Sequence, residues 1–197
     1  MKYAYMFLAL LLLSSWLVSS PIQAESNALG WLAIEKPGED GNLVVSPSEV
    51  SDVAVGRYDV VYTIDSENSK VFRSFNSGLN WEDITDNLTD DGAELPPNKV
   101  TIAPDDPDVV AVVADDGTAV YLSTDGGENW TNTSVPSLTG TIQAIAFSEE
   151  YTAGGDDYRE IAIGTAEWGD SSTTGQLWVY QIGSYPLSWQ DQELTID

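Results

Sequence analysis

Short apolar stretches alternate with polar residues along most of the chain, and turn residues separate them. In one such run Val120 and Leu122 would lie on one face of a strand, with Tyr121 and Ser123 on the other. The preceding Asp115-Asp116-Gly117 is a strong hairpin signal, because Asp-Gly between two β-rich runs favours a tight turn. Since helical periodicity is absent after the N-terminal segment, the pattern predicts an all-β fold.

One stretch of this pattern occurs twice. Residues 59–81 read DVVYTIDSENSKVFRSFNSGLNW and residues 108–130 read DVVAVVADDGTAVYLSTDGGENW, and the two align without a gap. The second unit is expected to hold four strands, at 99–103, 109–114, 118–123 and 130–135. Four short strands in a repeat of about 49 residues are typical of one blade of a β-propeller.

A third copy of the unit is less regular. The segments 161–163 and 177–180 take the places of its two central strands, and Trp189 keeps the spacing of the earlier tryptophans. The Gly-, Ser- and Thr-rich stretches 152–157 and 169–175 are expected to be surface loops. The sequence thus predicts three four-stranded antiparallel blades, at about 43–88, 97–136 and 140–195. Because propellers close with about four to eight blades, three blades predict a partial or open ring.

The first two units share a constant pattern before the fourth strand: Ser, any residue, Asp or Asn, any residue, Gly, two further residues, and Trp. Its members are Ser74, Asn76, Gly78 and Trp81 in the first unit, and Ser123, Asp125, Gly127 and Trp130 in the second. The pattern resembles the Asp box, or BNR repeat, of bacterial sialidases, sortilin-type receptors, some glucanases and BNR-like photosystem II assembly factors. The resemblance implies a β-propeller, and it implies that these residues are structural and lie away from an active site.

Local chemistry explains the pattern. Asp or Asn in a tight turn accepts hydrogen bonds from backbone amides just beyond it, and the glycine permits a positive φ. The tryptophan buries a large apolar area under the turn. We therefore expect Trp81 and Trp130 to be largely buried, and Gly78 and Gly127 to lie in the turns before the fourth strands.

The N-terminus has the layout of a secretory signal peptide. Lys2 precedes an apolar run over residues 4–18, and small residues lead to Ala24. The run of about 15 residues is short of the roughly 20 that span a bilayer. We expect residues 1–24 to be removed after Ala24, which leaves 25–197 secreted or at the cell surface, without a transmembrane segment.

A further tryptophan lies near the expected mature N-terminus. Residues 31–37 share the Trp-to-Pro spacing of residues 130–136. This favours a lone outer strand whose own blade is missing, and the alternative is a coincidental spacing.

Charge and composition narrow the function. The chain has 32 acidic and 7 basic residues, a formal net charge of −25, and neither cysteine nor histidine. An acidic surface repels nucleic acid and anionic lipid. Disulfides and thiolate metal sites are impossible, and the commonest general base is missing.

Candidate catalytic and metal sites are weak. A sialidase resemblance would imply an arginine triad with a tyrosine nucleophile, but only Arg57, Arg73 and Arg159 follow the signal peptide, in no recognisable motif. Three blades are also too few to build a central pocket. The acidic stretches 86–91 and 105–108 lack regular calcium-loop spacing, so solvated turns are the expectation, with weak calcium binding as the alternative. No catalytic residue, metal ligand or cofactor is nominated.

The sequence favours an exported, non-catalytic propeller module that binds or scaffolds an unknown protein or glycan. Further blades or self-assembly could complete its ring. One alternative is the N-terminal part of a larger propeller glycoside hydrolase, sialidase-like or glucanase-like, whose catalytic residues lie outside this chain. Another is an assembly factor of the photosystem II type, although the acidic surface offers no obvious basic patch.

Overall fold

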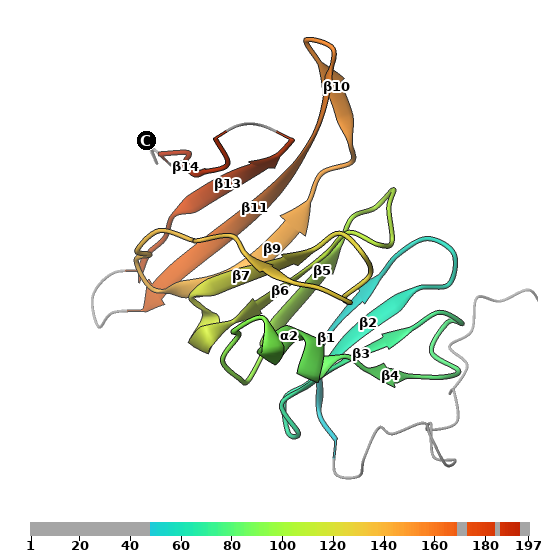
Figure 1. Cartoon of the computed structure of the whole chain (residues 1–197). Coiled ribbons are helices and arrows are strands. Elements are labelled where there is room, and N and C mark those ends of the chain that lie inside the picture. Colours follow the sequence, from blue (N-terminus) through green and yellow to red (C-terminus); the bar gives the residue numbers. More distant parts are fainter. Residues whose placement is uncertain (1–47, 169–172, 184–185, 194–197) are drawn as a thin grey trace, which may run out of the picture. The chain divides into compact units, whose positions relative to one another are not determined.

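The structure, a computed structural model, describes residues 48–168, 173–183 and 186–193. The expected signal peptide (1–24) and lone strand (31–37) lie outside the described residues. Three antiparallel sheets make up the described chain, so the all-β prediction is confirmed (Figure 1). No helix among the described residues is long and apolar enough to cross a membrane.

The first and second sheets have the same simple order, in which each strand pairs with its neighbour in sequence. The first consists of β1 (Val50–Val55), β2 (Val61–Asp65), β3 (Lys70–Ser74) and β4 (Glu82–Asp83). The second consists of β5 (Lys99–Ile102), β6 (Val110–Ala114), β7 (Ala119–Ser123) and β8 (Thr131–Asn132). A four-stranded antiparallel meander is the blade of a β-propeller.

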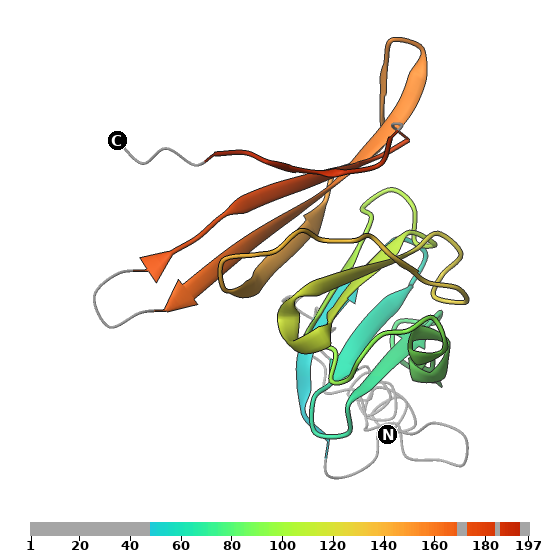
Figure 2. The same cartoon turned by 60° about the vertical axis from the view of Figure 1, so that its left-hand side comes forward.

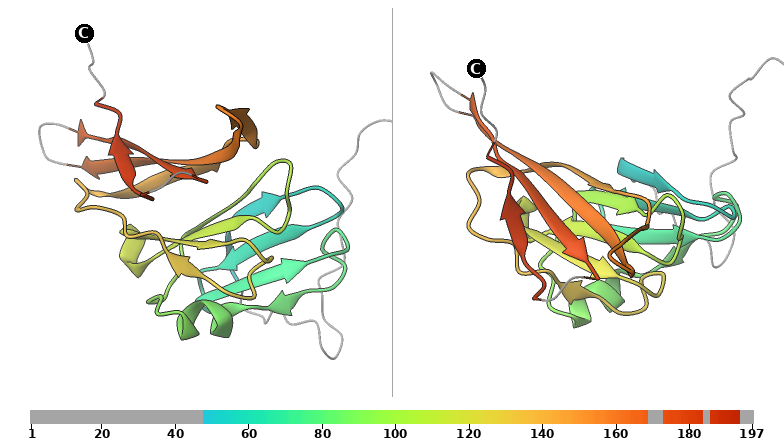
Figure 3. Two further views of the ribbon diagram at one scale, coloured as in Figure 1. Left: turned by 45° about the horizontal axis from the view of Figure 1, so that its top comes forward. Right: turned by 90° about the horizontal axis from the view of Figure 1, so that it is seen from above.

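The third sheet repeats this order with two additions. It consists of β9 (Thr141–Phe147), β10 (Tyr151–Ala153), β11 (Asp156–Trp168), β12 (Thr173–Thr174), β13 (Leu177–Ile182) and β14 (Trp189–Asp191). β9, β11, β13 and β14 pair in succession and correspond to one blade (Figure 3). β10 and β12 are short extra strands that pair with the two ends of the long β11.

Those two additions correct the expectation of a loop at 152–157 and, for Thr173–Thr174 alone, that of a loop at 169–175, of which 169–172 lie outside the described residues. β10 and the start of β11 form a hairpin that extends beyond the rest of the sheet (Figure 2). Its turn is Gly154-Gly155, with φ values of +67° and +99°. Two successive positive φ angles suit a two-residue hairpin turn. The two glycines therefore form the centre of a hairpin and not part of an irregular loop.

A short helix, α2 (Thr85–Asp90), was not expected from the sequence. It lies in the acidic stretch 86–91, which was read as solvated turns. Leu88 is fully buried, and the Thr85 hydroxyl accepts a hydrogen bond from the Val71 amide at 3.0 Å. One helical turn with a single buried leucine leaves no periodicity in the sequence, so tertiary contacts rather than pattern specify it.

β6 explains how the sheets pack, because all five of its residues are buried. Val110 and Val112 belong to a core shared with the first sheet, whereas Ala111 and Val113 belong to a core shared with the third. A strand buried on both faces reads as a continuous apolar run. The partners in the first core include Tyr62, Ile64, Val71, Tyr121 and Trp130, and those in the second include Val120, Ile161, Ile163, Tyr180 and Trp189.

The described sheets do not close into a ring. No described strand of the first sheet pairs with a strand of the third. The prediction of about three blades in an open ring is therefore confirmed for the part of the chain that the structure describes.

Candidate functional site

The turn before the fourth strand of the second sheet carries the pattern Ser123, Asp125, Gly127 and Trp130, which we call the second box. Hydrogen bonds within the turn close it. The Ser123 hydroxyl donates to Asp125 Oδ1 at 2.8 Å and accepts from the Gly127 amide at 2.8 Å. Asp125 Oδ1 also accepts from the Asn129 amide at 3.0 Å. All of these bonds stay within the turn, so the side chains hold the backbone rather than a ligand.

The first box (Ser74, Asn76, Gly78 and Trp81) makes the same bonds with an amide in place of the carboxylate. The Ser74 hydroxyl donates to Asn76 Oδ1 at 3.0 Å and accepts from the Gly78 amide at 2.9 Å. Asn76 Oδ1 accepts from the Asn80 amide at 2.8 Å. These bonds need only one acceptor oxygen, which Asn and Asp both supply. Asp125 uses its second oxygen as well, because Oδ2 accepts from the Asn129 side-chain amide at 2.7 Å.

Glycine is required in the second box for two reasons. Gly127 has φ +92°, and a Cβ atom there would lie 2.8 Å from Ile84 Cδ1 and 3.2 Å from Trp130 Cζ2. The tryptophan ring thus packs directly under the glycine, and no side chain fits between them.

The two tryptophans differ in burial, which corrects one expectation. Trp130 is buried, with 4% of its surface exposed, whereas Trp81 is only partly buried. Trp130 belongs to the core between the first and second sheets. Trp81 occupies the matching position of the first sheet, where no described sheet precedes it, so nothing comparable covers its ring.

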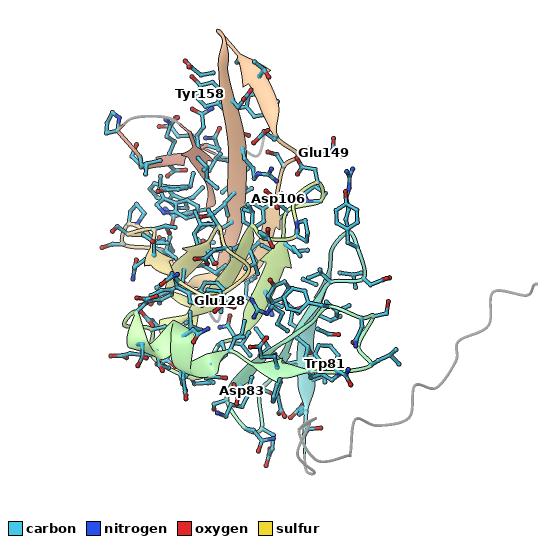
Figure 4. The ribbon with its side chains drawn as sticks, turned by 45° about the vertical axis from the view of Figure 1, so that its right-hand side comes forward. Trp81, Asp83, Asp106, Glu128, Glu149 and Tyr158 are labelled. Atoms are coloured by element: carbon cyan, nitrogen blue, oxygen red, sulfur yellow. The ribbon has the colours of Figure 1, made fainter. Side chains whose placement is uncertain are left out.

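Arg73 ties the first sheet to the turn of the second. It is 4% exposed, and its guanidinium donates to the Gly126 carbonyl and to Glu82 and Glu128, the latter two at 2.7 Å. Figure 4 labels Glu128, which lies in the turn after β7. These contacts cross the junction between the first and second sheets. The Arg73 guanidinium is therefore used for bonds within the chain and not for a ligand.

Tyr62 lies in the same cluster and would be the nearest analogue of a tyrosine nucleophile. Its hydroxyl donates to the Gly126 carbonyl at 2.9 Å. Burial raises the pKa of Tyr62 to about 12, although the neighbouring Arg73 charge acts in the opposite direction. At neutral pH the phenol therefore stays protonated and hydrogen-bonded, which suits a structural role.

Arg159 makes a second link, between the third sheet and the second. It is 5% exposed and donates to both carboxylate oxygens of Asp105, and Glu150 Oε2 lies 3.9 Å from its Nη2. Burial opposes ionisation of Asp105, but hydrogen bonds led by that from Arg159 lower its pKa. The acidic stretch 105–108 is therefore used for packing, and Asp106 Oδ1 accepts from the Asp108 amide at 3.0 Å. Among the described residues, no group of acidic side chains is arranged to hold a metal ion.

The third arginine, Arg57, is exposed in the turn after β1. The three arginines therefore have separate environments: two are buried links at different sheet junctions, and one is solvated. The structure does not bring them together as a carboxylate-binding triad.

A cavity of about 480 Å³ runs along the first strands of all three sheets, β1, β5 and β9. The expectation was that three blades are too few for a central pocket; they do form this cavity, which is open to solvent. Residues 52–55, 99–102 and 143–145 line it. Exposed side chains on its wall, Gln143 among them, make it accessible to solvent. Its volume falls in the range of about 300–1,000 Å³ that small ligands occupy.

The cavity wall combines free strand edges with polar side chains. β1, β5 and β9 each pair with one other described strand, so one edge of each stays unpaired. Asp52 crosses between two of them, because its Oδ2 accepts from the Val100 amide at 2.9 Å. Thr101 and Gln143 add a hydroxyl and an amide.

Lys99 supplies the positive charge of the cavity. Its ammonium lies 3.5 Å from the Asn98 carbonyl, and among the described residues no carboxylate is close enough to form a salt bridge with it. In so acidic a chain, an ammonium without a carboxylate partner is available to an incoming ligand. Lys99 could not be singled out from the sequence, because its strand carries no motif and its neighbours become apparent only in the fold.

Comparisons with known proteins return partial likenesses. No protein-family model matches the chain, and no curated protein matches it. Among solved structures, a xyloglucanase of glycoside hydrolase family 74 from Xanthomonas campestris has 15% identity and a TM-score of 0.47, and the match covers 72% of this chain and 22% of that one. An ancestral enzyme of the same family has 16% identity and a TM-score of 0.45, with 73% and 20% covered. YCF48 bound to a D1 peptide has 9% identity and a TM-score of 0.35, with 77% and 69% covered.

The chain spans about a fifth of the length of the two glycoside hydrolase structures. The order of strands within each sheet is what identifies the blades.

Proposed function

We propose that this chain is a non-catalytic binding module of an exported Asp-box β-propeller, and that the cavity along β1, β5 and β9 binds its ligand. The observation that carries the proposal is the cavity wall itself: three strand edges that pair with no other described strand, with Lys99, Thr101 and Gln143 between them. On the β5 edge the Val100 amide is already bonded to Asp52.

An extended polypeptide segment is the ligand that this wall suits best. Free amide and carbonyl groups on a strand edge pair with an added strand, and side chains nearby give specificity. Lys99 would contact an acidic side chain or carboxylate of that segment. A glycan offers hydroxyl groups to Thr101 and Gln143 but makes less use of the strand edges, so it is the second candidate.

Two carboxylates with shifted pKa values, the buried Asp65 and the exposed Asp83, are poorly suited to act as general acids. Burial opposes ionisation of Asp65 and Asp83, but hydrogen bonds led by those from Asn68 and Thr85, respectively, lower their pKa. A general acid at neutral pH requires the opposite shift. These carboxylates act as anchors for turns and strand ends.

Matched tryptophan substitutions test the cavity. The purified chain is screened on peptide and glycan arrays, and the variants Gln143→Trp and Gln190→Trp are screened beside it. Both glutamines lie on strands and are exposed, but only Gln143 lines the cavity. We expect binding to be lost in Gln143→Trp and kept in Gln190→Trp. Equal binding by both variants would place the ligand elsewhere.

Hydrolysis separates this proposal from the alternative that the chain is part of a larger glycoside hydrolase. The purified chain should leave a fluorogenic sialoside and xyloglucan, the substrate named for one structural neighbour, at the level of the buffer blank. Turnover that disappears when Arg57, Arg73 or Arg159 is replaced would overturn the non-catalytic proposal.

Export has its own test. Mass spectrometry of the mature protein should find Glu25 at the N-terminus, because cleavage is expected after Ala24. Mature protein that still contains Lys2 would contradict the signal peptide.

A further inference from the structure

Each sheet has two faces of different character. We call the face toward the preceding sheet the upstream face and the face toward the following sheet the downstream face. In the second sheet the upstream face is large and apolar and packs on the first sheet; it comprises Val100, Ile102, Val110, Val112 and Tyr121. Its downstream face is smaller and packs on the third sheet; it includes Ala111, Val113 and Val120.

The first sheet has an upstream face of the same kind. Val53 and Val55 pair with β2 just as Val100 and Ile102 pair with β6, so the two pairs hold equivalent positions. Val100 and Ile102 are 5% and 8% exposed, whereas Val53 and Val55 are 55% and 70% exposed. The difference arises because a sheet covers the second upstream face, whereas no described sheet covers β1 on the first. Thr63 and Phe72, farther across the same face, are 4% exposed, so the open part of this face is its β1 side.

Other apolar groups of the first sheet share this exposure. Trp81 is only partly buried, and the turns of the sheet expose Tyr58, Phe75 and Leu79. Large exposed apolar patches usually mark interaction sites in soluble proteins, and Val53 and Val55 supply neighbouring apolar side chains on this face.

The third sheet has an uncovered downstream face. Ala162 pairs with Val179 as Val113 pairs with Val120, so these positions are equivalent. Val113 and Val120 are fully buried, whereas Ala162 and Val179 are only partly buried, and Ala146, which pairs with Ala162, is exposed. The centre of this face consists of the small side chains of Ala146, Ala162 and Val179, which leave room for larger ones from a partner. The polar side chains of Glu160, Gln181 and Gln190 lie beside them on the same face.

We infer that a second copy of this chain covers these faces, with the upstream face of the first sheet in one copy packed on the downstream face of the third sheet in the other. The chain itself shows this contact twice, because at both of its junctions an upstream face with β-branched and aromatic residues packs on a downstream face. Two copies joined at both ends supply six sheets, which lies within the four to eight that close a propeller. The contact is heterologous, and two such contacts close a dimer with no face left over.

Net charge sets the conditions for this dimer. Each copy carries a formal charge of −25, so the copies repel one another at low ionic strength. Salt screens that repulsion but leaves apolar contacts intact. The dissociation constant should therefore fall as salt is raised from 0.05 M to 1 M, whereas a dimer held by ion pairs would show the opposite trend.

Sedimentation velocity of the purified chain, over a range of concentrations at high salt, tests the inference. We expect a dimer that dissociates on dilution. Val53→Asp and Ala146→Asp should each raise the dissociation constant by at least about tenfold, because each puts a carboxylate into an apolar contact. Leu187→Asp adds the same charge at a side chain 53% exposed in the turn before β14, and it should behave like the parent chain.

Mixing the two variants tests the head-to-tail arrangement. Each variant keeps one intact face, so a mixture should form a dimer more readily than either variant alone. A parent chain that stays monomeric at every concentration would overturn the inference, and so would an Ala146→Asp variant that dimerises as well as the parent. All substituted positions are exposed, and unchanged urea unfolding of each monomer serves as the control for folding. The result does not depend on whether the cavity binds a ligand, because the readout is mass alone.

Discussion

The two aligned repeats, 59–81 and 108–130, form the same turn, but an adjacent sheet gives equivalent residues different contacts in the two. The second box is held from two sides: its own bonds close the turn, and the first sheet contacts it through Arg73, Tyr62 and Asn87. The first box has its own bonds and a link within its sheet, where Ser77 donates to Asp59 at 2.9 Å. Identical turn chemistry therefore fixes the shape of the turn, and the adjacent sheet decides how much that turn contributes to stability.

Replacing the tryptophans should give the largest difference between the repeats. Trp130→Ala removes a buried ring and should lower the free energy of unfolding by about 3–5 kcal/mol. Trp81→Ala should lower it by about 1–2 kcal/mol, because a partly exposed ring loses less burial. Urea titrations followed by far-UV circular dichroism measure both. Equal losses would show that the first box is covered as well as the second.

Replacing Arg73 of the first repeat by leucine, the residue at the equivalent position of the second repeat, should cause the next largest loss of stability. Arg73 aligns with Leu122, and Arg73→Leu removes three hydrogen bonds, two of them to carboxylates. We expect a loss of about 2–3 kcal/mol in the free energy of unfolding, since bonds to charged groups are among the stronger ones. Arg57→Leu is the matched control at an exposed arginine and should stay within about 0.5 kcal/mol of the parent. A neutral Arg73→Leu would mean that the link contributes nothing.

Giving the second box the amide of the first should have the smallest effect, and its sign depends on pH. A hydrogen bond from Asn129, ahead of the opposing effect of burial, lowers the pKa of Asp125. A carboxyl with a lowered pKa stabilises the fold above its unfolded value of about 3.9, and this stabilisation is lost as the pH falls through the folded pKa. Asp125→Asn should therefore be slightly less stable than the parent at pH 7, by at most about 0.5 kcal/mol for an exposed site. The difference should shrink or vanish near pH 3, and a difference that grows on acidification would contradict it.

The sequence was sufficient for the features that depend on local pattern. The strands of the second repeat, expected at 109–114 and 118–123, are found at Val110–Ala114 and Ala119–Ser123. The alternation of apolar and polar residues and the Asp-Gly turns are local signals, so they can be recognised without knowing which sheets lie on either side. The third repeat was found through spacing even though its box is lost.

Features that depend on contacts between sheets could not be read in advance. The exposure of Trp81 follows from what lies beside the first sheet, and Leu88 is buried because it fills a gap between two sheets. The cavity brings together three strands that are distant in sequence, and Lys99 has no motif around it. The two arginine links were likewise hidden, because an isolated arginine in a strand gives no indication of its partner.

The link from Arg73 to the Gly126 carbonyl bears on how such a protein can grow by tandem duplication. A duplicated second repeat would be followed by a turn like its own, but it would carry Leu122 where that turn is met by Arg73 in the present chain. The new junction would keep its apolar packing and lack its polar tie. Repeats in this chain are therefore not interchangeable, because each carries the polar side chains that its own junction with the next sheet requires. Lineages that add blades by duplication would have to regain an arginine, or a substitute for it, at every new boundary.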